Sequence, residues 1–221
     1  MIGDGENVAM QLYSFFRSGT SHRLRIALNL KGLAYEIVPV DLRSEAHRSA
    51  SYLELQPQGL VPALVDGDRV LIQSPAIIEW LEETHPTPAL MPADADGRAR
   101  VRALAAIVGC DIHPLNNRRV LQALRRDFGA DSAAVQRWCD AWIESGFDAI
   151  EKLLADDTRR GRYCVGDAPT LADVYLVPQV ESARRFGVNV ARWRRIAAVD
   201  AACAALEAFA RAVPARQPDA V

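Results

Sequence analysis

The chain has 221 residues, of which half are hydrophobic and 24% charged, a composition typical of a folded protein of one or two domains. Its 26 basic and 28 acidic residues give a net charge of −2, which argues against a dedicated nucleic-acid-binding protein because such proteins carry a basic excess. Only Lys31 and Lys152 are lysines, so 24 (26 − 2) of the basic residues are arginines. A GC-rich genome explains most of them; the alternative is that some bind carboxylates through the planar guanidinium group.

The cysteines are well separated and form no CxxC pair, which excludes the usual spacings of zinc sites and dithiol redox sites. We therefore expect free thiols in a reducing compartment, the cytoplasm. No stretch approaches the roughly 18 apolar residues of a membrane span, so no membrane partner is expected. The acidic stretch 1–9 lacks the features of a signal peptide and is predicted to be a disordered leader.

The first part of the chain alternates short strands and helices. Met10–Phe15 is a predicted strand, and the apolar residues from Leu24 to Leu30 recur at helical spacing until Gly32, a typical helix end. Tyr35–Val40 is predicted to be an edge strand, because Pro39 cannot donate a hydrogen bond to a neighbour.

A hairpin and a third element complete this region. Two short strands, Ala63–Val65 and Arg69–Ile72, flank Asp66-Gly67, a strong hairpin signal. Ser74 is the predicted N-cap of the following helix, with Pro75 in its first turn.

A proline-rich connector at 86–92 is the best candidate for a domain boundary, dividing the chain into domains at 10–89 and 90–221. The second domain is predicted to be wholly helical, with Thr170 and Asp173 forming a capping box. Trp138, Trp142 and Phe147 are expected on an inward face. The predicted helices cover 98–127 (kinked at Pro114), 132–154, 171–186 and 199–212.

Polar residues gather where the first strand meets the first helix. The segment Arg17–His22 places hydroxyl groups at a helix N-terminus, where free N–H groups could hold an anion or stabilise a thiolate. An ordinary N-cap turn is the simpler interpretation. Val61, beside a Pro62 that could be cis, offers a backbone N–H and C=O to a peptide-like ligand, and Gln73 and Ser74 could receive a carboxylate. An ordinary turn and an ordinary N-cap are the structural alternatives.

The segment 110–119 contains polar residues that are unusual for a helix interior. His113 by itself is more often a buried structural histidine, but Asn117 and Arg118 follow about one turn later, which favours a binding site.

Five segments together resemble the zeta class of the soluble glutathione transferases, which includes maleylacetoacetate isomerases and bacterial maleylpyruvate isomerases. The resemblance covers nearly all of 10–214. The matching segments are FFRSGTSHRLRIALNLKG (15–32), LVPAL (60–64), QSPAIIEWLEE (73–83), GCDIHPLNNRRVL (109–121) and TLADVYLVPQVESARRF (170–186).

The resemblance implies an N-terminal thioredoxin-like α/β domain that binds glutathione, a C-terminal all-helical domain and a homodimer. Ser18 would hydrogen-bond the glutathione sulfur, Val61 would pair with its cysteinyl backbone beside a cis Pro62, and Gln73 and Ser74 would hold its γ-glutamyl carboxylate. Gln58, Thr20 and His113 complete the expected glutathione-binding set. Gly19 and Thr20 replace the second Ser and the Cys of the zeta motif, so the usual cysteine chemistry of the class is in doubt, although this form resembles maleylpyruvate isomerases.

The expected activity is a glutathione-dependent cis–trans isomerisation of a maleyl keto acid, maleylpyruvate or maleylacetoacetate. Ser18, Arg17 and Arg185 are the expected catalytic residues. The substrate carboxylates are expected to bind Arg17, His113, Asn117, Arg118, Arg119 and Arg185. The alternatives are a transferase that conjugates glutathione to electrophiles and a non-catalytic binding module.

Overall fold

The structure is a computed structural model that describes residues 10–157 and 161–220; the predicted leader lies outside them. The chain divides into two compact units, one formed by residues up to Pro88 together with those from Glu207 onward, the other by Ala89–Leu206. The first boundary lies one residue from the predicted one. The last part of the chain differs from the prediction, because its residues pack on the first unit rather than extending the helical domain.

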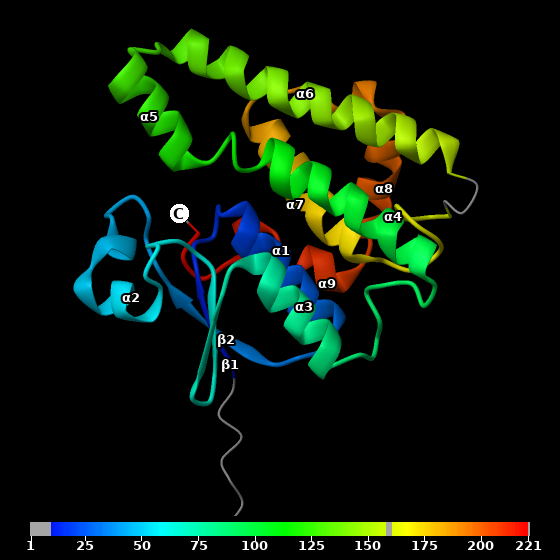
Figure 1. Ribbon diagram of the computed structural model, residues 1–221, viewed down its shortest axis with the longest axis horizontal. Helices are drawn as coiled ribbons and strands as arrows, with labels where there is room; N and C mark the ends of the chain where they lie inside the picture. Colours follow the sequence, from blue (N-terminus) through cyan, green and yellow to red (C-terminus); the bar gives the residue numbers. More distant parts are fainter. Residues whose placement is uncertain (1–9, 158–160, 221) are drawn as a thin grey trace, which may run out of the picture. The chain divides into compact units, whose positions relative to one another are not determined.

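The first unit contains a four-stranded mixed sheet in the order β2-β1-β3-β4 (Figure 1). β1 pairs in parallel with β2, aligning Met10 with Tyr35, and antiparallel with β3, aligning Leu12 with Leu64. β3 and β4 form the predicted hairpin, and β2 lies at an edge as Pro39 indicated. The strands are β1 (Met10–Ser14), β2 (Tyr35–Pro39), β3 (Ala63–Asp66) and β4 (Arg69–Ile72).

Helices cover this sheet and supply the other half of its core. α1 packs against both α3 and α9, and the buried side chains of Leu12, Ile26, Leu64 and Ile77 exclude water between the layers. This arrangement of a mixed sheet with flanking helices confirms the predicted thioredoxin-like unit. Its helices are α1 (Gly19–Leu30), α2 (Ala50–Leu55), α3 (Ser74–Thr84) and α9 (Glu207–Ala210), with 3₁₀ turns η1 (Ala46–Arg48) and η4 (Pro214–Arg216).

The second unit is entirely helical among its described residues, as predicted. α6 is its longest helix (Figure 1). α7 begins at the predicted capping box, where the Asp173 carboxylate accepts hydrogen bonds from Thr170 N (2.8 Å) and Oγ1 (2.9 Å). The elements are α4 (Ala95–Ala106), a π-helical turn η2 (Ile107–Ile112), α5 (Arg118–Phe128), α6 (Ser132–Asp156), α7 (Leu171–Arg185), a 3₁₀ turn η3 (Val190–Arg192) and α8 (Arg194–Ala204).

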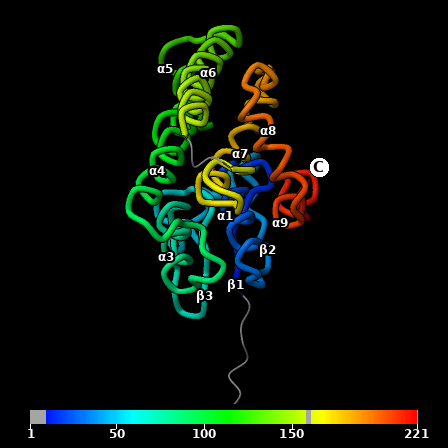
Figure 2. Tube along the Cα trace, turned by 90° about the vertical axis from the view of Figure 1, so that its right-hand side faces the viewer, coloured from blue at the N-terminus to red at the C-terminus, as the bar shows by residue number. Residues whose placement is uncertain are grey.

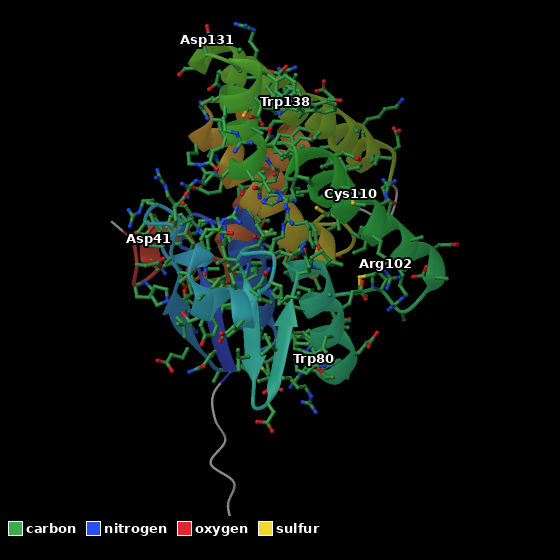
Figure 3. The ribbon with its side chains drawn as sticks, turned by 60° about the vertical axis from the view of Figure 1, so that its left-hand side comes forward. Asp41, Trp80, Arg102, Cys110, Asp131 and Trp138 are labelled. Atoms are coloured by element: carbon green, nitrogen blue, oxygen red, sulfur yellow. The ribbon has the colours of Figure 1, made fainter. Side chains whose placement is uncertain are left out.

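Three predictions about the helices are wrong in detail. The helix predicted over 98–127 is divided into α4, η2 and α5, because Pro114 supplies no N–H and ends the helix instead of kinking it. The helix predicted over 199–212 ends at Ala204 and resumes as the short α9. Phe147 is buried as predicted, but Trp142 is 38% exposed. Trp138 on α6 (Figure 3) is half-buried. Its Nε1 donates to Leu115 O at 2.9 Å.

Arg25 is a fully buried cation within α1. Its guanidinium donates to Ala212 O (2.9 Å), Ser14 Oγ (3.1 Å) and Phe16 O (3.0 Å). Burial lowers the Arg25 pKa to about 10, so the side chain stays charged near neutral pH. It therefore ties β1, the turn after β1 and the C-terminal segment to α1.

We expect Arg25→Met to destabilise the protein by about 3 kcal/mol, because three acceptors would lose their donor in a buried place. Urea unfolding measures this change. Arg69→Met is the matched control, since the Arg69 side chain is 69% exposed and its ion pair with Asp66 (3.4 Å) lies on the surface. Equal unfolding midpoints for the two variants would contradict the structural role of Arg25.

Candidate functional site

The first part of the candidate site is the turn between β1 and α1. Ser18 N donates to Phe15 O at 2.9 Å, which closes the turn. Ser18 is the N-cap of α1, and its Oγ accepts from Ser21 N at 3.2 Å. The ordinary N-cap interpretation is therefore true, and it also fixes the hydroxyl at the positive end of the helix, where an anion such as a thiolate is favoured.

Two hydroxyl groups connect this turn to the loop before β3. Ser18 Oγ and Thr20 Oγ1 lie 2.9 Å apart, and Thr20 Oγ1 donates to Val61 O at 2.9 Å. Because the Thr20 proton is directed to Val61, the hydrogen bond between the two hydroxyls uses the Ser18 proton. Thr20 therefore positions Ser18 by accepting from it and donating to Val61, a role that a cysteine would perform less well because its thiol is both a weaker acceptor and a weaker donor.

Val61 presents its backbone beside the predicted cis peptide bond to Pro62, which the structure contains. The prediction that both Val61 backbone groups are free for a ligand is only half correct, because the C=O accepts from Thr20. Within the described residues the Val61 N–H has no hydrogen-bond partner, although the residue is only 9% exposed. A peptide-like ligand with a carbonyl group would satisfy this donor.

The start of α3 differs from the prediction. Gln73 is the N-cap and Ser74 is already helical. Gln73 has φ 67° and ψ 112°, a region that non-glycine residues rarely adopt. The Ser74 hydroxyl is buried and has no hydrogen-bond partner in the described chain. Strain and an unsatisfied buried hydroxyl at a helix N-terminus are typical of an anion-binding site.

Gln58 lies beside this second helix N-terminus. Its Oε1 accepts a hydrogen bond from Gln73 Nε2, and its backbone N–H donates to Gln56 Oε1 at 2.7 Å. Gln58 is therefore hydrogen-bonded to Gln73, which directly precedes Ser74 in the chain. Ser18, Thr20 and Val61 form a second hydrogen-bonded group. That these six residues bind glutathione stays a prediction.

Arg17 is exposed at the same turn, with its guanidinium carbon 5.7 Å from the centre of the Phe16 ring. An exposed cation next to Ser18 can meet an anionic ligand without the cost of burying the charge.

In the helical unit, the predicted residues surround the break between α4 and α5. His113 N donates to Val108 O at 2.9 Å, which ends the π-helical turn, and both His113 and Pro114 are half-buried. Cys110 lies on the outer side of this turn (Figure 3). Asn117 is the N-cap of α5, since its Oδ1 accepts from Arg119 N at 3.1 Å. Asn117 therefore has a capping role in addition to any binding role.

Asn116 was not predicted, and its environment makes it a stronger candidate than Asn117. Both its Nδ2 and its Oδ1 are buried without a hydrogen-bond partner among the described residues. A buried amide with neither atom satisfied is costly unless a ligand or water completes it. The only sequence signal was its position after Pro114, where a helix is interrupted and side chains change direction.

The three predicted arginines of this unit are all exposed, at helix ends. Arg118 and Arg119 begin α5, while Arg185 ends α7. Arg185 donates to Ser182 Oγ at 3.2 Å and lies 5.6 Å from the centre of the Phe186 ring. The expectation that these arginines and those of the first unit serve one substrate stays a prediction.

The described cysteines are all free thiols, as expected. Burial raises the pKa of Cys139 to about 11 and also raises that of Cys203, which disfavours the thiolate form that a nucleophilic cysteine requires. Among the described residues no group of three or more His, Cys, Asp or Glu could hold a metal ion. None of the described helices combines the length and apolar character required to cross a membrane.

Comparison with known proteins shows family matches in both units of the chain. Residues 17–84 match the family model of the glutathione S-transferase N-terminal domain, and residues 132–198 match that of the C-terminal domain. A maleylpyruvate isomerase from Ralstonia is 68% identical over 95% of this chain and 99% of its own length.

Two solved structures extend the comparison. The holo structure of a maleylpyruvate isomerase, described as a bacterial zeta-class glutathione S-transferase, is 67% identical with a TM-score of 0.94, covering 96% of this chain and 100% of its own. A maleylacetoacetate isomerase from Methylobacterium extorquens, crystallised with malonate and glutathione, is 39% identical with a TM-score of 0.92, covering 96% and 99%. The second structure shows a relative that holds glutathione together with a dicarboxylate.

Proposed function

Since this chain belongs to the zeta class of the glutathione S-transferase family, we propose that it is a glutathione-dependent isomerase that converts a maleyl keto acid, maleylpyruvate or maleylacetoacetate, to its fumaryl isomer. The observation that carries this proposal is the 68% identity with a maleylpyruvate isomerase over almost the whole of both chains. The hydrogen bonds among Ser18, Thr20 and Val61, and the α3 N-terminus at Gln73, support it.

The residues of the first unit fit glutathione. The Val61 N–H would pair with the cysteinyl backbone, which supplies the carbonyl that this buried donor lacks. The Ser74 hydroxyl, Gln73 and the free N–H groups of α3 would hold the γ-glutamyl carboxylate, and Gln58 would keep the Gln73 side chain oriented through their amide hydrogen bond. Ser18 at the N-terminus of α1 would then face the sulfur. Its hydroxyl proton, which is directed to Thr20 in this structure, would turn to the thiolate and so lower the thiol pKa.

When bound, glutathione would supply a thiolate for reversible addition to the maleyl double bond; the bond would become single and rotate, and departure of the same thiolate would restore it with trans geometry. Arg17 holds one substrate carboxylate beside Ser18. Arg118, Arg119 and Arg185 bind the other carboxylate and stabilise negative charge on the keto oxygen. His113, Asn116 and Asn117 complete the polar lining, with Asn116 contributing an amide that the protein itself leaves unsatisfied.

The decisive experiment incubates the purified protein with glutathione and maleylpyruvate and follows the loss of the keto-enol absorbance, with product identified by NMR. We expect rapid formation of fumarylpyruvate that requires glutathione. Maleylacetoacetate is compared in parallel, and the ratio of the two kcat/KM values names the preferred substrate. If neither acid turns over while a chlorinated aromatic is conjugated to glutathione, the protein is a general transferase and the isomerase proposal is wrong.

We expect Arg185→Ala to raise KM for the maleyl substrate about tenfold, since one charged hydrogen-bond donor to a carboxylate is lost. KM for glutathione should stay unchanged. Arg184→Ala, which removes the neighbouring arginine and its ion pair with Asp200 (2.6 Å), is the control for a general effect on the end of α7. An unchanged KM for the maleyl substrate would remove Arg185 from the substrate site.

We further propose that the protein works as a homodimer in the cytoplasm. Family membership supports the dimer, and the free cysteines agree with a reducing compartment. Light scattering coupled to size-exclusion chromatography tests the oligomeric state, for which a mass near twice 24.3 kDa is expected.

A further inference from the structure

The last described residues of the chain are fixed against the first unit. Gln217 is 7% exposed, and its Nε2 donates to Arg211 O (2.9 Å) and Val213 O (2.8 Å). These two bonds fold the chain back after α9, and the segment around the C-terminal end lies beside α1 in both views of the chain (Figures 1 and 2). The segment that follows α9 is therefore stabilised by hydrogen bonds within itself, in addition to its contacts with the rest of the first unit.

Asp219 joins this segment to the turn that carries Ser18. Its Oδ2 accepts a hydrogen bond from Phe16 N at 2.9 Å, although 203 residues separate the two positions. Phe16 is 5% exposed, so its N–H would have little access to water if the carboxylate were removed. The next residue, Ala220, packs against a hydrophobic cluster that includes Phe15, Phe16 and Val61.

Both polar groups of Phe16 are thus satisfied by side chains from outside the turn. The N–H is bound by Asp219, and the C=O accepts from the buried guanidinium of Arg25 at 3.0 Å. Ser18 follows two residues later, and its own N–H returns to Phe15 O. A shift of Phe16 would therefore move Ser18 relative to Thr20 and Val61, which define where the sulfur binds.

We propose that Asp219 is a positioning residue that fixes the β1–α1 turn, and through it Ser18, in the geometry required to activate the bound thiol. This inference rests on the proposed function for its catalytic meaning. In this proposal Asp219 positions the turn by accepting the hydrogen bond from Phe16 N. Its charge also interacts with the buried Arg25, but a negative charge by itself would oppose thiolate formation.

Three variants separate these effects. Asp219→Ala removes the acceptor, Asp219→Asn keeps an amide oxygen that can accept from Phe16 N but removes the charge, and Arg216→Ala alters an exposed residue of the same segment. The first measurement is the pKa of the thiol of glutathione bound to each protein, followed by the ultraviolet absorbance of the thiolate. The second is kcat and KM for both substrates of the isomerisation.

We expect Asp219→Ala to raise the thiol pKa and to lower kcat at neutral pH about 5- to 10-fold, with KM for the maleyl substrate unchanged. Asp219→Asn should restore most of the activity, and Arg216→Ala should match the wild type. The proposal is wrong if Asp219→Ala titrates like Arg216→Ala, or if Asp219→Asn is as impaired as the alanine variant. Should the alanine variant fail to fold, Asp219→Ser, whose side chain is too short to reach Phe16, replaces it.

The thiol titration requires only that glutathione binds, so it remains informative if the wild type proves not to isomerise maleyl acids. In that case the wild type fails the activity assay while the order of thiol pKa values among the variants still decides the role of Asp219. Failure of the proposed function and failure of this inference are therefore distinguishable.

Discussion

Replacing Ser18 by alanine is expected to lower kcat/KM for the isomerisation by about 100-fold or more, a loss comparable to that of other single donors to a developing anion. Ser18 Oγ already lies at the N-terminus of α1, where it accepts from Ser21 N, so only its hydroxyl proton, which is directed to Thr20, has to turn toward the sulfur. Steady-state kinetics and titration of the bound thiol measure the effect, and both kcat and the thiol pKa should change.

Ser51→Ala, which removes an exposed hydroxyl on α2, is the matched control and should behave like the wild type. Loss of the Ser18 N-cap by itself costs about 1 kcal/mol of stability, so unfolding midpoints must be compared in the same buffer. If Ser18→Ala keeps the wild-type thiol pKa and kcat, another group activates the thiol, and the helix N-terminus alone would be the first to consider.

A second large effect is expected in acid. His22 on α1 is 3% exposed, and its Nε2 has no hydrogen-bond partner within the described chain. Burial, together with the charges of Arg25 and Arg23, lowers the His22 pKa from 6.5 to about 3. The folded protein thus keeps the ring neutral at pH values where the unfolded chain binds a proton.

The direction of the pH dependence follows from this lowered pKa. The contribution of His22 to stability is complete above pH 6.5 and is lost as the pH falls toward 3, because the unfolded state binds more protons over that interval. Between pH 7 and pH 4 the loss due to His22 is about 3 kcal/mol. This loss can be measured by urea unfolding at intervals of one pH unit. As the pH falls, the free energy of unfolding of the wild type should decrease more than that of His22→Gln, so that the difference between the two proteins narrows or reverses.

The variant His22→Leu provides a second side chain that does not titrate, and it should show the same flattened pH dependence as His22→Gln. Because the two replacement side chains differ in shape and polarity but neither titrates, a pH effect common to both variants comes from the loss of the proton-binding group and not from altered packing. Parallel stability curves for the wild type and both variants would show that His22 does not cause acid sensitivity.

Much of the first unit could be predicted because its signals are local. Pro39 marked the edge strand, Asp66-Gly67 marked the hairpin, and Gly67 indeed adopts φ 57°. Periodicity likewise predicted α1, and the capping box of Thr170 and Asp173 predicted the start of α7. These features depend on backbone chemistry within a few residues, so they are visible without knowledge of the tertiary structure.

The errors concern features that depend on distant parts of the chain. Gln73 adopts a strained positive φ, which the Ser74-Pro75 sequence does not indicate. As a result the N-cap of α3 is Gln73 and not Ser74. The π-helical turn before Pro114 adds less than one residue per turn, so the apolar pattern over 98–127 changes too little to reveal it. The exposure of Trp142 was not predictable because the buried face of α6 depends on which other helices pack against it, and the sequence of α6 alone does not specify them.

The candidate site was predicted in two ways. Residue type and helix position indicated a site at Ser18 and Gln73, and the resemblance assigned the individual roles. Asn116 was not predicted because asparagine is common in loops. What distinguishes it is that its Nδ2 and Oδ1 are both buried without a hydrogen-bond partner among the described residues, which only the structure shows. Asp219 was not predicted because 203 residues separate it from Phe16, and no local sequence pattern indicates a contact between residues that far apart in the chain.

The division of the first unit between the two ends of the chain has a consequence for protein synthesis. The thioredoxin-like unit is translated first, yet Arg25 cannot bind Ala212 and Phe16 cannot bind Asp219 until the ribosome has made the whole helical unit. The helical unit, Ala89–Leu206, is thus inserted into the sequence of the thioredoxin-like unit. We expect a nascent chain stalled before residue 207 to remain protease-sensitive in its N-terminal unit, and the same unit to become resistant once the last residues emerge.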